Sequence, residues 1–418
     1  MKLPILLAAV ARADDFASEL LEDFARPGAG GHLGKSTYAM SHPFAFKGFM
    51  EQYFPTAEQL VRENSTKQCV EWAKLCIDDG SSSANVCKSK SAAQLHSVGA
   101  YERDSGSKSM EDIEADFTAA MGDLSAHDPY FETHAAFLTK DLDYYAGVFG
   151  NASVPTHHAT FAEGGTSYDS LLLQVPGSLK AGAKSLLNLL LLGETTATLA
   201  SRPGRNHAPR ASQASRSSLA SARAKLDSAH HLYDADSKPV LTLVHVSWAT
   251  SNLTRDVDFF ENGLGGVKTD AGATGGMQTY NGAMTKGDAA EFRYVQSAKA
   301  TRGPTTVAAW ERYQTSLHKT CFKSAQNVGF DRLADNHIGH SENGKALDTF
   351  IHAQKASGLP YRIYGPPGKG SPPWFFYGYM PNGWGYQLTG QCTDKSLCPK
   401  SPFYDMCTQG VLPDCTAA

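Results

Sequence analysis

Several motifs that identify common classes of protein are missing from this chain. It has no H-E-x-x-H and no G-x-S-x-G, so zinc-protease and α/β-hydrolase chemistry has no local support, although a dispersed Ser-His-Asp set stays open. No two of its cysteines have the C-x2-C spacing of a structural zinc knuckle. A formal net charge of -4 gives no reason to expect binding to nucleic acid or to acidic membranes.

Long apolar runs are also missing, so we expect no membrane span in the mature chain. At the start, Lys2 precedes a short apolar run and then Ala11-Arg12-Ala13, which is the order of a secretory signal peptide. We predict this signal at residues 1–13; a frayed first helix of a cytosolic protein is the alternative. The leucine-rich segment SLLNLLLLG at 185–193 is too brief for a span and predicts a helix packed on its own domain.

Asparagine and cysteine positions favour export from the cell. Glycosylation acceptor sequences begin at Asn64, Asn151 and Asn252, and such acceptors are used only along the secretory route. An even number of cysteines with a dense cluster near the end is typical of disulfides in an oxidising compartment. These residues are Cys69, Cys76, Cys87, Cys321, Cys392, Cys398, Cys407 and Cys415. Three lie early and five late, so either one bridge joins the two sets or one thiol in each stays free.

Composition divides the chain into two halves. Residues 201–231 are rich in Ser, Ala and Arg and poor in large apolar side chains, which predicts a linker with a solvated helix from Ser217 onward. We therefore expect an N-terminal domain at 30–195, a linker at 196–238 and a C-terminal domain at 239–392. A cysteine-rich tail follows at 393–418.

A strand–helix–strand pattern occurs twice in the C-terminal half. LTLVHVSW predicts a strand with His245 near its middle, and the helix after it has Asn252 or Ser251 as its N-cap. NHIGHSENGKALDTFIHAQKASGLPYRIYG repeats the pattern, with His337 in the strand and Gly358 at the end of the helix. Each unit closes with a further strand, DAAEFRYVQ in the first and PNGWGYQLTG in the second. The N-terminal half shows a weaker version of the same pattern.

These segments resemble the βαβββ module of the vicinal oxygen chelate superfamily, which includes glyoxalases and extradiol dioxygenases. The stretch from NHIGHSENGKALDTFIHAQKASGLPY through MPNGWGYQL is the clearest match. The resemblance implies an α+β fold of tandem domains, one in each half of the chain. In each domain, two βαβββ modules would form an open mixed β-barrel with flanking helices.

The resemblance also implies a divalent metal bound by the first and last strands of two paired modules. Carried over residue by residue, the ligands are His245 and Glu291 from one module with His337 and Gln387 from the other, and Glu291 is also the candidate catalytic base. Two imidazoles and a carboxylate suit Fe, Mn, Ni or Zn, whereas Gln387 stands where Glu is usual and weakens the site. His340 would project from the face opposite His337. The N-terminal set has no carboxylate and implies a degenerate site: His42, Gln94, His134 and Gln174.

Two functions follow from these residues. The first is a secreted metal-dependent isomerase, lyase or dioxygenase acting on a small oxygenated molecule. The alternative is a secreted protein that binds a small ligand without catalysis, in barrels that lost their metal and whose polar residues bond to each other or to water. It is supported by aromatic residues around the second barrel: Trp248, Trp374, Phe375, Phe376, Tyr377, Tyr379, Trp384 and Tyr386. The oligomeric state stays open.

Overall fold

The computed structural model describes residues 33–39, 43–62, 70–81, 94–100, 134–163, 166–175, 188–195, 216–250, 252–274, 277–283, 291–296, 337–358, 361–364, 374–381 and 385–391. The predicted signal peptide, the first part of the linker and the cysteine-rich tail lie outside these ranges, as do His42 and Asn64. Of the eight cysteines, only Cys76 is described; it is buried and disulfide-bonded. The pairing of the cysteines therefore stays a prediction.

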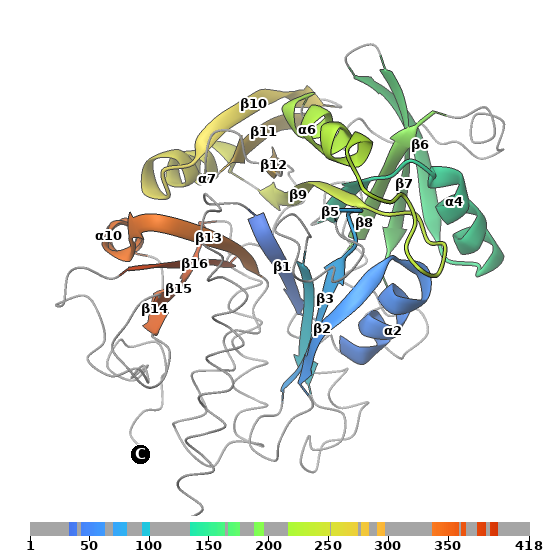
Figure 1. The fold of residues 1–418 in the computed structure, drawn as a ribbon. Coiled ribbons are helices and arrows are strands. Elements are labelled where there is room, and N and C mark those ends of the chain that lie inside the picture. The colour runs from blue at the N-terminus through green and yellow to red at the C-terminus, as the bar shows by residue number, and fades with distance from the viewer. Residues whose placement is uncertain are drawn as a thin grey trace, which may run out of the picture.

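The strand, helix and three strands expected from the sequence occur four times along the chain (Figure 1). Module 1 contains β1 (Leu33–Ala39), α2 (Pro43–Tyr53), β2 (Thr56–Arg62), β3 (Val70–Ile77) and β4 (Gln94–Ala100). Module 2 contains β5 (His134–Leu138), α4 (Leu142–Asn151), β6 (Thr156–Glu163), β7 (Thr166–Gln174) and β8 (Asn188–Glu194).

Helix α6 (Arg216–Asp227) precedes the second half of the chain. Module 3 contains β9 (Thr242–Thr250), α7 (Leu253–Asp258) with its π-helical continuation η4 (Phe259–Gly263), β10 (Val267–Thr274), β11 (Met277–Ala283) and β12 (Glu291–Gln296). Module 4 contains β13 (His337–Ala346), α10 (Leu347–Ala356), β14 (Tyr361–Tyr364), β15 (Trp374–Tyr379) and β16 (Gly385–Gln391).

The described strands form two mixed eight-stranded sheets, which confirms the α+β class. Sheet I joins modules 1 and 4 in the order β14-β15-β16-β13-β1-β4-β3-β2, and sheet II joins modules 2 and 3 in the order β10-β11-β12-β9-β5-β8-β7-β6. In every module the first and last strands pair in parallel, while the two first strands at the centre of each sheet pair antiparallel. Each sheet ends in two edge strands, so the described strands do not form a closed barrel.

This strand order corrects the tandem arrangement predicted from the sequence. Modules 3 and 4 do not share a sheet; each pairs with a module from the first half of the chain. The physical reason is that the side-chain pattern along one strand identifies a strand and its buried face, but does not determine which other first strand lies beside it. That choice depends on long-range packing, which single-strand patterns do not record.

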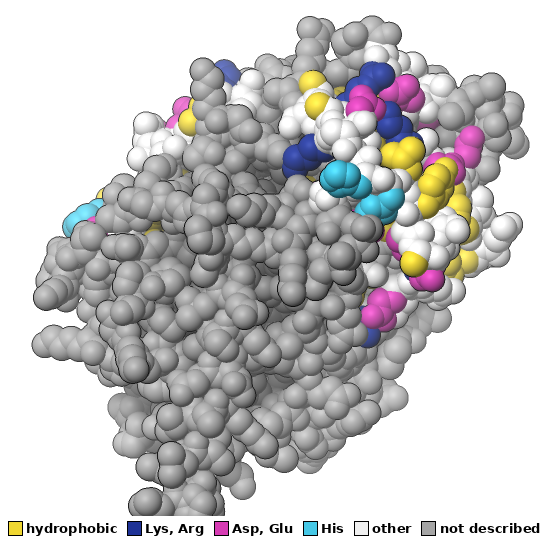
Figure 2. Space-filling view, in the orientation of Figure 1, with side chains coloured by type: hydrophobic (Ala, Val, Ile, Leu, Met, Phe, Trp, Pro, Cys, Tyr) yellow, Lys and Arg dark blue, Asp and Glu magenta, His cyan; other side chains and the backbone are white. Residues whose placement is uncertain are grey.

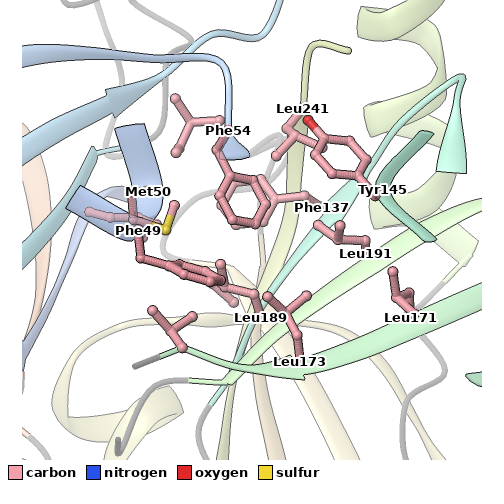
Figure 3. Packing of buried hydrophobic residues seen from close by; sticks show 14 of the residues in the cluster. Phe49, Met50, Phe54, Phe137, Tyr145, Leu171, Leu173, Leu189, Leu191 and Leu241 are labelled. Carbon is pink, nitrogen blue, oxygen red and sulfur yellow. The ribbon is translucent and has the colours of Figure 1, made fainter. Parts of the chain in front are cut away.

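Helices α2 and α4 join the two sheets through one apolar cluster (Figure 3). Phe49 of α2 stacks on Phe149 of α4 with ring centroids 6.2 Å apart, and Phe54 stacks on Tyr145 at 5.5 Å. The cluster continues into sheet II through Ala135 and other residues of β5, β7 and β8. On the other side of the molecule, Phe259 of η4 contacts Tyr386 of β16 at 6.3 Å. Aromatic side chains thus hold the two sheets together, between α2 and α4 on one side and between η4 and β16 on the other.

Helix α6 lies on the face of sheet II opposite to α4 (Figure 1). Leu219, Ala222 and Leu226 recur at helical spacing and are at most 2% exposed, in one cluster with Ala136 and Leu138 of β5. The β5 residues at 135 and 137 belong instead to the apolar cluster of α2 and α4. This division follows from the alternation of side chains between the two faces of a strand. The predicted helix is therefore present, but the expectation that it is solvated was wrong.

Ion pairs also connect the outer surface of α6 with residues at the strand ends of module 2. Arg223 Nη2 lies 2.9 Å from Glu194 Oε1, and Lys140 pairs with Asp227. These four side chains are 39–51% exposed. Figure 2 shows positive and negative side chains intermingled on the surface above α6. Because exposed pairs contribute little, the apolar stripe provides most of the stability of this contact.

The leucine-rich segment at 185–193 gives a second correction. Residues 188–194 form strand β8, not a helix, and Leu189 to Leu192 are at most 1% exposed. An unbroken apolar run fits a strand that is covered on both faces, here by α4 and α6. Among the described residues, no helix is long and apolar enough to cross a membrane. Asn151 and Asn252 are exposed, so the glycosylation predicted there remains sterically open.

Three hydrogen bonds stabilise the start of the helix in module 3. Asn252, one of the two N-cap candidates, is the N-cap of α7, and its side chain accepts a hydrogen bond from the Arg255 backbone nitrogen. The Thr250 hydroxyl donates to the Asp256 carboxylate, which is 1% exposed and also accepts from the Arg255 guanidinium. These contacts join the end of β9 to the first turn of α7.

The apolar stripe of α6 should dominate its attachment to sheet II. We predict that Leu226→Ala lowers the free energy of unfolding by about 2–5 kcal/mol, because it leaves a cavity in a buried cluster. Arg223→Ala should cost less than about 1 kcal/mol, because its ion pairs are exposed. Urea denaturation measures both. Equally small losses would show that α6 does not pack on the sheet as described.

The buried carboxyl of Asp256 should make the free energy of unfolding depend on pH. Its burial raises the pKa of this carboxyl above the ordinary value of 3.8, against the opposing contacts of Thr250 and Arg255. Because the folded protein then holds this proton more tightly than the unfolded chain, the associated stability is lost as the pH rises from 3.8 through the folded-state pKa. Across that window, the free energy of unfolding of the wild type should fall relative to Asp256→Asn. A relative rise would reverse the assigned direction of the pKa shift.

Candidate functional site

Two histidines from different modules meet at the centre of sheet II. His134 begins β5, His245 lies in β9, and each is 1% exposed. Their Nε2 atoms are 3.0 Å apart, and the rings meet edge to face with centroids 5.1 Å apart. The antiparallel register explains the contact: His134 lies opposite Ser247 and His245 lies opposite Ala136, so both side chains project from the same face.

The last strand of each module adds a polar residue beside each histidine. In the parallel ladders, His245 is in register with Glu291 of β12, and His134 is in register with Asn188 of β8. The two modules are thus related by an approximate two-fold axis through the β5–β9 pair. This axis exchanges His134 with His245 and Asn188 with Glu291 at the level of the backbone. The side chains of Asn188 and Glu291 are outside the described set.

The histidine pair is compatible with two kinds of chemistry. Two neutral imidazoles can share one hydrogen bond between their Nε2 atoms if one ring carries the proton there. Alternatively, both nitrogens can bind one divalent ion, because two imidazole ligands about 2.0–2.1 Å from an ion and at right angles are about 3 Å apart. The 3.0 Å separation fits that spacing. Among described side chains, however, no group of three or more His, Cys, Asp or Glu residues is placed to hold a metal.

Helix α6 covers the face from which the two histidines project. Ala136 lies opposite His245 and packs in one cluster with Leu219, Ala222 and Leu226 of α6. A molecule that approaches the histidines from this side meets the apolar stripe of α6 first.

The four predicted ligands are divided between the two sheets. His245 and Glu291 lie in sheet II, whereas His337 of β13 and Gln387 of β16 lie in sheet I. His337 is in register with Gly385, and Gln387 with Gly339. The strands β9 and β13 lie in different sheets, so modules 3 and 4 do not pair through their first strands as the resemblance implied. The reason is that module 3 pairs with module 2 and module 4 pairs with module 1.

The N-terminal set is divided in the same way. His134 belongs to the central pair of sheet II and is not part of a separate degenerate site. Gln94 begins β4 of sheet I opposite Lys35, and Gln174 ends β7 opposite Asn188 instead of standing on a closing strand. At the register positions of sheet I that correspond to those of the sheet II site, the backbone carries Lys35, Gln94, His337 and Gly385. That set has one histidine and no carboxylate.

Two of the aromatic residues proposed for ligand binding are part of the core. Phe376 and Tyr386 are at most 1% exposed, and the Tyr386 hydroxyl donates to Gln354 Oε1 at 2.7 Å. Burial raises the pKa of Tyr386 well above its ordinary value. Gly378 lies against this ring, where an added Cβ would come within 2.7 Å of it. These rings support α10 and η4. The side chains of the other six aromatic residues are not among those described.

No protein-family model and no curated protein matches the chain. Solved structures similar to it include glyoxalase I from Zea mays, with 11% identity, a TM-score of 0.45, and coverage of 86% of this chain and 92% of that one. The fosfomycin resistance protein FosX from Listeria monocytogenes is 10% identical over 37% of this chain and 94% of its own, with a TM-score of 0.23. Methylmalonyl-CoA epimerase from Streptomyces coelicolor is 12% identical over 40% and 92%, with a TM-score of 0.25.

Proposed function

We propose that the protein is a metal-dependent enzyme of the vicinal oxygen chelate type with one site, in sheet II. It acts on a small oxygenated molecule as an isomerase, lyase or dioxygenase. The observation that carries this proposal is the buried contact of His134 with His245, whose Nε2 atoms are 3.0 Å apart. A second support is the register of Glu291 with His245, which brings a carboxylate-bearing residue next to the pair.

His134 and His245 would hold the metal, with Glu291 as the third protein ligand and Asn188 beside it as a neutral, weaker one. A divalent ion bound there would act as a Lewis acid on oxygen atoms of the substrate. Glu291 is the candidate base that takes a proton from the substrate, because it is the one carboxylate at the four register positions. Helix α6 would keep bulk water from this face and so strengthen the electrostatic interactions there.

Non-catalytic binding of a small apolar ligand is the second candidate. It is favoured by the apolar residues that share the histidine face with α6, among them Leu138, Leu172 and Leu190. A metal bound by the two histidines would argue against it. Export remains part of the proposal, supported by the disulfide-bonded Cys76 and the exposed Asn151 and Asn252.

Metal binding by three histidine variants tests two points together: that the protein binds a metal, and that modules 2 and 3 supply its ligands. Apo protein titrated with Co²⁺ should bind about one ion. His134→Ala and His245→Ala should each lose about a hundredfold or more in affinity, because each removes an imidazole ligand. His337→Ala is the matched control and should bind as the wild type does, since His337 stands in sheet I. Calorimetry gives the affinity, and the visible spectrum of Co²⁺ reports its ligands.

A wild-type protein that binds no Co²⁺ would end the enzyme proposal and leave the binding-protein candidate. Loss of binding in His337→Ala but not in His134→Ala would restore the site predicted from the sequence. Circular dichroism of each variant establishes that it is folded.

A further inference from the structure

A buried serine next to the histidine pair has no hydrogen-bond partner within the described part of the chain. Ser247 is 0% exposed, lies two residues after His245 in β9, and is opposite His134 in the β5–β9 register. Its Oγ atom is without a partner among the described residues. Buried hydroxyls normally form hydrogen bonds, because removing one from water without replacement costs free energy.

Packing alone does not require this hydroxyl. The two-fold relation between modules 2 and 3 exchanges Ser247 with Ala136, which is opposite His245 and is also 0% exposed. The equivalent place in module 2 is therefore filled by a methyl group. The hydroxyl makes the two halves of the site different, on the face that carries both histidines.

We propose that Ser247 is a substrate-positioning residue of the site in sheet II. Its hydroxyl donates a hydrogen bond to an oxygen atom of the small oxygenated ligand bound beside His134 and His245. A carbonyl, enolate or hydroxamate oxygen is the matching chemical class, since each accepts a hydrogen bond from a hydroxyl. This inference rests on the proposed function, because it needs the histidines to form the binding site.

Thr242 supplies a matched control in the same strand. It is 1% exposed, and its hydroxyl also has no partner among the described residues. It lies opposite Leu138, beyond the bulge that separates it from the histidine register. Removal of either hydroxyl should leave the apo protein at least as stable as the wild type, because each removes an unsatisfied buried group. Only removal at Ser247 should change ligand binding.

Acetohydroxamate, which presents two adjacent oxygens, is the probe for this test. Wild type, Ser247→Ala and Thr242→Val are loaded with Co²⁺ and titrated with acetohydroxamate, and the change in the Co²⁺ spectrum is followed. Ser247→Ala should bind the probe about tenfold more weakly or worse, as expected for loss of a hydrogen bond to a charged oxygen. Thr242→Val should bind it as the wild type does. The unfolding temperature of each apo variant is measured in parallel.

Equal affinity of Ser247→Ala and wild type for acetohydroxamate would overturn the role of Ser247 while leaving the metal site intact. A marked fall in the unfolding temperature of apo Ser247→Ala would also overturn it, because the hydroxyl would then be structural. Equal losses of affinity in both variants would show a general disturbance of β9. A wild type that binds no Co²⁺ would instead overturn the proposed function, and this inference with it.

Discussion

The antiparallel pairing of β5 with β9 is the contact on which the proposed site depends. It places His134 opposite Ser247 and His245 opposite Ala136, so that two imidazoles from residues 111 positions apart share one face. The parallel ladders at either side then bring Asn188 and Glu291 into register with them. A shift of one residue in the central pair would turn one histidine to the other face of the sheet and separate the two rings.

Sheet II is covered on both faces, and the two covers differ in kind. Helix α4 packs on one face through a cluster that also contains α2 of module 1, so this contact joins the sheets. Helix α6 packs on the histidine face through three small or medium apolar side chains and exposed ion pairs. The segment that connects the two halves of the chain is thereby part of the environment of the proposed site. Its composition is that of a linker, yet its apolar stripe is buried.

Local features of the fold could be predicted from the sequence, whereas long-range pairing could not. Short-range rules predicted Gly358 at a helix end, where its φ is 66°, and narrowed the N-cap of α7 to Ser251 or Asn252, of which Asn252 is the observed one. The partners of the modules depend on which apolar faces fit, so His245 was assigned to His337 when its neighbour is His134. Asn188 was missed because a leucine run fits a buried strand and a buried helix equally well. Histidines occur in three of the four first strands, at His134, His245 and His337, and a search that considered every pairing of these three would have included the contact of His134 with His245.

The contact between His134 and His245 is tested most directly by NMR of metal-free protein labelled with ¹⁵N in its histidine rings. The two Nε2 atoms, 3.0 Å apart, should show nitrogen–nitrogen coupling through a shared hydrogen bond. Replacement of either histidine by Asn should abolish the coupling and shift the ring signals of the other, while His337→Asn should leave both unchanged. Coupling of His245 to His337, or a His134 signal that is indifferent to the loss of His245, would contradict the account.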